Sequence, residues 1–113
     1  MAYHTFDPNI NGRQLNVTIG SKGRIILNAA VTRLFKSQDV EHVLLLWDAQ
    51  GPTIGIQPTP KEPRSFKIGF AAHNATIYAP AFLEYVHAHQ GTFPATWNGL
   101  LEFVLDREIV RRK

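Results

Sequence analysis

The stretch VTIGSKGRIILNAAVTRLFKSQDVEHVLLLWDAQGPTIGIQP, residues 17–58, organises this chain. Two β-rich runs at 17–19 and 25–27 flank a loop bounded by glycines, and this arrangement is typical of a β-hairpin. Asn28 follows directly and stands before a helical pattern that begins at Ala29. An asparagine in that place accepts hydrogen bonds from the first backbone N–H groups of a helix, so the sequence predicts an N-cap.

The helix and the segment after it complete the local pattern. Ala30, Leu34 and Phe35 recur at helical spacing, and we expect them on the buried face of a helix of about two turns. The nearly continuous apolar run at 42–48 predicts a strand, and a Gly-Pro turn returns the chain through a second strand at 53–57. The expected order is therefore strand, strand, helix, strand, strand.

This string resembles the swapped-hairpin DNA-binding domains of the AbrB/SpoVT/MazE superfamily. The matching pieces are VTI at 17–19, KGR at 22–24, IILN at 25–28, SQD at 37–39, VLLL at 43–46 and IGIQP at 54–58. The chain departs from the family pattern at Asn28, where proline is usual, and before Asp39, where glycine is usual. The resemblance implies an α+β, mainly β fold, which is a small swapped-hairpin barrel with two short helices.

The second part of the chain repeats the pattern after a proline-rich segment. Residues 57–64 contain three prolines and are expected to form an extended connector, because proline fits neither the interior of a sheet nor that of a helix. The predicted elements that follow are a strand at 65–69, a loop at 70–74, a strand at 75–78, a helix at 81–89 capped by Gln90 and Gly91, and a hairpin at 92–105 turning at Asn98-Gly99.

An internal duplication of a β-β-α-β-β unit explains this repetition. Residues 17–20 align with 66–69, and residues 25–29 align with 76–80. Tandem repeats occur in the MraZ branch of the superfamily, so the resemblance implies a pseudo-dimer within one chain; otherwise a second protomer supplies the missing half. The predicted divisions are an N-terminal arm (1–15), a first AbrB-like unit (16–60), a proline-rich connector (61–65), a second unit packed against the first (66–106) and a basic tail (107–113).

Composition limits the chemistry. The 113-residue chain is 44% hydrophobic and contains seven phenylalanines, which excludes a disordered chain, and the absence of cysteine excludes disulfides and thiolate zinc sites. The histidines form no His-Glu-x-x-His motif, and His87 and His89 stand only two apart on a predicted helix, so we expect no metal and no cofactor. No serine lies in a nucleophile-elbow pattern, so the chain is not expected to be an enzyme. No signal peptide or membrane span is visible, which favours a cytoplasmic protein.

The candidate functional surface is basic. The net charge of +3 permits binding to a polyanion. The resemblance points to Lys22 and Arg24 on the loop and Arg33 on the helix as phosphate contacts on double-stranded DNA, with Arg13 nearby. Asn28 is a further candidate for a base contact, although the N-cap alone explains it.

The corresponding loop of the second half, residues 70–74, contains no lysine or arginine. One chain therefore offers only one basic loop, and we expect a homodimer or a larger even-numbered oligomer that presents two.

Two other functions remain open. One is a protein-interaction module, such as an antitoxin-like or accessory protein, that docks a protein partner through the connector or the basic tail. The other is a small-ligand or enzymatic domain with an aromatic pocket built from Trp47, Tyr78, Phe93 and Trp97, although these residues also suit a core.

Overall fold

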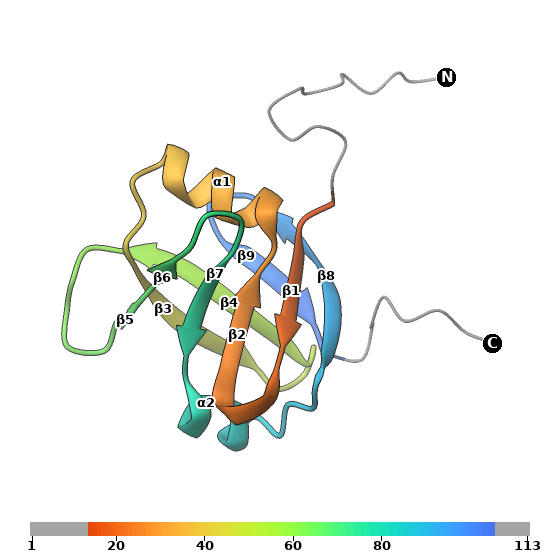
Figure 1. The fold of residues 1–113 in the computed structure, drawn as a ribbon. Helices are drawn as coiled ribbons and strands as arrows, with labels where there is room; N and C mark the ends of the chain where they lie inside the picture. The colour runs from red at the N-terminus through yellow and green to blue at the C-terminus, as the bar shows by residue number, and fades with distance from the viewer. Residues whose placement is uncertain (1–13, 106–113) are drawn as a thin grey trace, which may run out of the picture.

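The computed structural model describes residues 14–105, which form a mainly β fold with two short helices (Figure 1). In chain order the elements are β1 (Asn16–Ile19), the 3-10 turn η1 (Ser21–Gly23), β2 (Arg24–Leu27), α1 (Ala29–Ser37), β3 (His42–Asp48), β4 (Thr53–Thr59), β5 (Phe66–Lys67), β6 (Gly69–Phe70), β7 (Ala75–Tyr78), α2 (Pro80–Tyr85), β8 (Gly91–Trp97) and β9 (Leu101–Val104).

The strands form a nearly closed antiparallel barrel in the order β5-β3-β4-β9-β8-β1-β2-β7-β6. The two ends of this order are joined by Ile68, since β5 pairs with β3 and β6 pairs with β7. Ile68 is buried, and its N–H donates to the Glu41 carbonyl at 3.0 Å. The single predicted strand at 65–69 is thus two short strands that change partner at one buried residue.

The first hairpin and α1 follow the predicted pattern. Val17, Ile19, Ile25 and Leu27 alternate with less buried residues and point into the barrel. The predicted face of α1 is corrected in part: Ala30 and Phe35 are buried together with Val31 and Thr32, while Leu34 is only half-buried.

Helix α2 is shorter than predicted and ends at Tyr85 instead of His89. His87 adopts a left-handed conformation with φ of 58°, its N–H donates to the Glu84 carbonyl, and the Ala88 N–H donates to the Leu83 carbonyl. These two bonds form a Schellman motif, which closes the helix before the glycine expected to cap it. Gly91 is instead the first residue of β8.

The extended segment expected at 57–64 begins later, because Pro58 lies within β4 and pairs with Val43 of β3. The ladder between β4 and β9 ends at Ile56, so no strand within residues 14–105 pairs with the other side of β4 at Pro58. Proline lacks an N–H, and an edge position is where a strand tolerates that loss.

The strand ladders of the two halves correspond. β1·β2 matches β6·β7, β3·β4 matches β8·β9, and β1·β8 matches β5·β3. The ladders β2·β7 and β4·β9 each join a strand to its own counterpart, so Ile25 lies opposite Ile77. By this correspondence Val43, Leu45 and Trp47 of β3 match Phe93, Ala95 and Trp97 of β8.

The expected alignment of residues 25–29 with 76–80 is wrong by one position. It matches Ile26, which is half-buried, with Ile77, which is fully buried. Side chains alternate between the two faces of a strand, so a one-residue shift exchanges inside for outside. The ladder correspondence instead matches Ile25 with Ile77, and both point inward.

One hydrophobic core fills the barrel and draws on both halves. Its fully buried large residues are Val17, Ile25, Leu27, Val31, Phe35, Val43, Ile54, Ile56, Ile77, Phe93, Leu101 and Phe103. Figure 1 shows α1 at one end of the barrel and α2 at the other, beside the turn between β1 and β2.

Candidate nucleic-acid interface

The η1 turn presents Lys22 and Arg24 at the α2 end of the barrel. Both side chains are exposed, and the Lys22 backbone is left-handed with φ of 62°. Arg24 donates from Nε to the Ser21 carbonyl at 3.2 Å and from Nη2 to Ser21 Oγ at 3.3 Å. These bonds hold the guanidinium against the turn, so the two cations lie on one short, ordered segment.

Contacts from the second half of the chain fix this turn. The Gly23 carbonyl accepts a hydrogen bond from the Ala79 N–H at 2.8 Å, directly before α2. Gly23 has φ of +77°, and a Cβ added there would overlap Pro80. Only glycine permits both this conformation and this close approach. The position of the first loop therefore depends on the second helix.

Both polar groups of the Asn28 side chain are bonded within the protein. Its Oδ1 accepts from the Val31 N–H at 3.1 Å, which confirms the predicted N-cap, and its Nδ2 donates to the Gln14 carbonyl at 2.9 Å. A base contact that keeps both bonds would have to use the second N–H of Nδ2 or the second lone pair of Oδ1.

The structure does not bring Arg33 together with Lys22 and Arg24. Arg33 is exposed on α1, at the end of the barrel opposite the η1 turn (Figure 1). β2 runs between them, so the loop and the first helix, which were expected to share one end, lie at opposite ends of the barrel. The helix that lies beside the η1 turn is α2, which contributes Glu84 to the hollow that Lys22 lines. Arg13 lies outside the described residues.

A second basic group at the α1 end was not predicted. Lys36 donates from Nζ to the Ala71 carbonyl at 3.2 Å, and its Nζ lies 5.8 Å from the centre of the Phe70 ring. His73 and Arg33 line a small hollow beside it. The loop at 70–74 thus packs on α1 as the η1 turn packs on α2, and a long-range contact of this kind leaves no local signal in the sequence.

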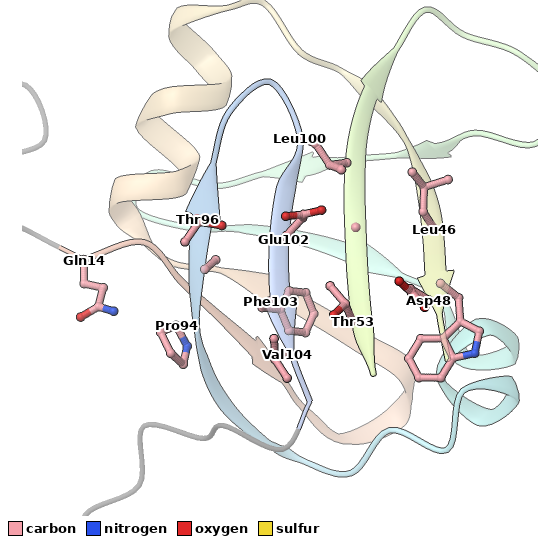
Figure 2. A pocket seen from close by; sticks show the side chains of 13 residues that line it. Gln14, Leu46, Asp48, Thr53, Pro94, Thr96, Leu100, Glu102, Phe103 and Val104 are labelled. Carbon is pink, nitrogen blue, oxygen red and sulfur yellow. The ribbon is translucent and has the colours of Figure 1, made fainter. Parts of the chain in front are cut away.

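A hollow with a volume of about 590 Å³ lies on the outer face of β3, β4, β9 and β8 (Figure 2). Leu46, Gly55, Glu102 and Thr96 form one row across these strands. Gly55 provides the floor, because a Cβ there would lie 3.2 Å from Leu100 Cδ1 and 3.5 Å from Leu46 Cβ. We call this hollow the outer groove.

The outer groove is apolar and acidic. Leu46, Leu100 and Val104 line it together with Asp48 and Glu102, and no lysine or arginine is among its described lining residues. Carboxylates repel phosphates, so this face does not suit a nucleic acid. The sequence did not predict this groove, because a nearly continuous apolar run such as 42–48 is typical of a strand buried on both faces, whereas Leu46 is exposed.

The aromatic and histidine candidates do not form a site in residues 14–105. Phe93 is buried, Trp97 contacts Phe35 edge-on with ring centroids 5.7 Å apart, and Trp47 packs against the core. Tyr78 is 66% exposed on β7. No three potential metal-ligating side chains gather within this range, and none of its helices has the length and apolar character needed to cross a membrane.

No protein-family model, no curated protein and no solved structure matches the chain.

Proposed function

We propose that this protein binds double-stranded DNA as an AbrB-type regulator and that the η1 turn is its phosphate-contacting element. The observation that carries the proposal is the ordered pair of exposed cations, Lys22 and Arg24, on a turn fixed by Ser21 and by the start of α2. The Arg24 guanidinium is already held by Ser21, so it loses less conformational freedom than an unbound side chain when it meets a phosphate. Arg33 lies on α1 at the other end of the barrel and is not part of this element.

We further propose that the halves are copies of one β-β-α-β-β unit interleaved as in the swapped-hairpin superfamily. The matched ladders support this, because each one has a counterpart or joins a strand to its own counterpart. The matched ends support it as well, since each barrel end combines a loop from one half with the helix of the other.

We propose that the protein acts as a homo-oligomer. Two cations on one turn give only weak affinity for DNA at physiological salt. Two chains related by a two-fold axis present two such turns, which suits a palindromic site.

The test is a titration of duplex DNA at several salt concentrations with the double variant Lys22→Asn/Arg24→Gln. Asparagine is chosen because it tolerates the left-handed backbone at position 22. We expect weaker binding and a log–log salt slope that is shallower by roughly 0.9 for each lost phosphate contact. The control Lys61→Gln/Arg64→Gln removes the same charge from exposed positions in the connector and should retain the slope.

Three outcomes are informative. An unchanged affinity and slope in the turn variant, with its fold intact, would remove the turn from the DNA surface. Weaker DNA binding in the variant Arg33→Gln/Lys36→Gln, with unchanged binding in the turn variant, would indicate that the interface lies at the α1 end. Equal losses in the turn variant and the control would indicate only a general effect of charge.

The second candidate is a protein-interaction module, and the outer groove favours it. The groove combines exposed Leu46 with two carboxylates, a surface that fits a basic and apolar segment of a protein partner. A protein that leaves duplex DNA unbound at low salt would support this candidate against the first.

A further inference from the structure

Strand β3 is paired on one side only over most of its length. β4 pairs with all of His42–Asp48, whereas β5 pairs only with His42 and Val43. Within residues 14–105 no backbone group bonds to residues 44–48 from the side of β5. Apart from its pairing with β4, Asp48 is bonded within this range only by the turn that follows it, where the Gly51 N–H donates to its carbonyl at 3.2 Å and the Gln50 N–H donates to its Oδ1 at 3.0 Å. We call this side of residues 44–48 the β3 edge; Figure 2 shows Leu46 and Asp48 on this outermost strand of the four-strand layer.

The direction of the backbone groups along the β3 edge follows from one hydrogen bond. The Ile68 N–H donates to the Glu41 carbonyl at 3.0 Å, so the backbone of residue 41 faces β5. In an antiparallel strand alternate residues face the same neighbour. Val43, Leu45 and Trp47 therefore face this side. Beyond Val43 the N–H and C=O groups of Leu45 and Trp47 point outward, and no strand among residues 14–105 meets them.

The other half of the barrel demonstrates that such an edge accepts a strand. Ala95 of β8 is the counterpart of Leu45, and its N–H donates to the Leu15 carbonyl at 2.8 Å, because the chain before β1 continues alongside β8. Beside Leu45 the chain has already turned away, since the Ser65 N–H bonds back to the Glu62 carbonyl at 3.0 Å. Within residues 14–105, the position beside Ala95 is therefore occupied by Leu15, and the corresponding position beside Leu45 is unoccupied.

We propose that the β3 edge binds the β3 edge of a second copy of this chain, antiparallel and about a two-fold axis at Leu46. This register sets Leu45 opposite the partner's Trp47 and Trp47 opposite the partner's Leu45, so every outward N–H and C=O of both strands is paired. Any other two-fold register leaves some of these groups unpaired or collides with β5 or with the turn at Ala49. The β3 edge is therefore long enough for this register.

The side chains along the β3 edge also favour a second copy. Natural edge strands are usually protected by lysine, proline or a bulge, and the run Leu44–Trp47 contains none of these. In the proposed register Asp48 lies opposite the partner's Leu44, so the acids do not meet. Leu46 is 39% exposed and would lie against the partner's Leu46, which removes both from water. The edge is self-complementary, as an isologous interface requires.

Sedimentation equilibrium of the full chain at rising concentration tests the proposal. The wild-type mass is expected to rise from 12.7 kDa toward twice that value. Leu46→Glu and Leu46→Lys should each remain monomeric, because two like charges then meet at the axis, and an equimolar mixture of the two should associate again. The control Thr96→Glu places the same charge in the same row on β8, away from the edge, and should behave as the wild type.

Amide exchange gives a measurement that needs no variant. The N–H groups of Leu45 and Trp47 should exchange more slowly as concentration rises, while those of other strands stay unchanged. A wild type that is monomeric throughout, or association that survives in both charged variants, would overturn the proposal. This inference rests on the self-association proposed above, for which the β3 edge supplies the interface. Because the sedimentation and exchange experiments contain no DNA, a negative result in them is distinct from a negative result in the DNA titration.

Discussion

The Asn28 side chain makes one hydrogen bond within α1 and one to a residue distant in the sequence. Its carbonyl oxygen caps α1 and its amide nitrogen ties the helix start to Gln14. We predict that Asn28→Ala lowers the free energy of unfolding by about 1 kcal/mol through the lost cap, with the second bond adding to the effect. Urea denaturation of the wild type and the variant measures the difference.

Asn28→Asp is a second variant, because it retains an oxygen acceptor for the Val31 N–H. It also replaces the donor to Gln14 by an oxygen that repels the Gln14 carbonyl, while its negative charge is favourable at the start of a helix. We expect it to be more stable than Asn28→Ala, and a less stable Asn28→Asp would show that the bond to Gln14 contributes more than the cap.

For single residues, the sequence predicted those features that depend only on neighbouring residues in the chain. An asparagine before a helical pattern predicts a cap because the bonded N–H is three residues away. Lys22 and Arg24 were expected to be exposed for a similar reason, since they lie on a short loop. Arg33 was placed with them only by assuming that the loop and helix of one half share an end, and that depends on contacts between residues far apart in the sequence.

At the scale of elements, the docking of the η1 turn on α2 depends on Gly23. We predict that Gly23→Ala destabilises the fold strongly, because an alanine there adopts a left-handed backbone and its Cβ would lie 2.8 Å from the Pro80 nitrogen. Gly99→Ala is the control: its φ of +96° carries the conformational penalty, but nothing lies within 4 Å of the added Cβ.

The control should cost about 1–2 kcal/mol and Gly23→Ala clearly more. Thermal unfolding followed by circular dichroism compares them. If the two variants lose the same stability, the contact between η1 and α2 adds nothing beyond backbone strain.

The elements that could be predicted were those with a strong periodic pattern. The apolar run of β3 and the alternation in β1 and β2 predicted strands correctly. The end of α2 could not be predicted, because His87 takes the left-handed conformation that a glycine signal usually marks. The division of β5 from β6 was equally hidden, since it arises from a change of partner and not from the residues themselves.

At the scale of the whole molecule, nearly every strand depends on the other half. β1 pairs with β8, β2 with β7, β3 with β5 and β4 with β9, and the Thr18 and Thr92 hydroxyls lie 2.9 Å apart across one of these ladders. Alternation within single strands predicts a β-rich chain but does not specify which strands pair. The barrel order therefore had to come from the three-dimensional structure.

This interdependence predicts how the chain behaves when it is divided at the connector. The fragment of residues 1–60 loses all four ladders to the second half and leaves the inward faces of β2 and β4 exposed. Exposed strand edges and an open core do not support a folded monomer. We expect the fragment to be unfolded or to pair with itself, and to regain a folded state when mixed with the fragment of residues 61–113.

Circular dichroism and sedimentation of each fragment, alone and mixed, measure this outcome. The intact chain should unfold in a single cooperative transition, because residues from both halves share one core. A fragment of residues 1–60 that folds as a stable monomer would contradict the interleaved arrangement. The pairing of β2 with β7 and of β4 with β9 would then be contacts between two independent folding units, and the η1 turn would keep its shape without α2.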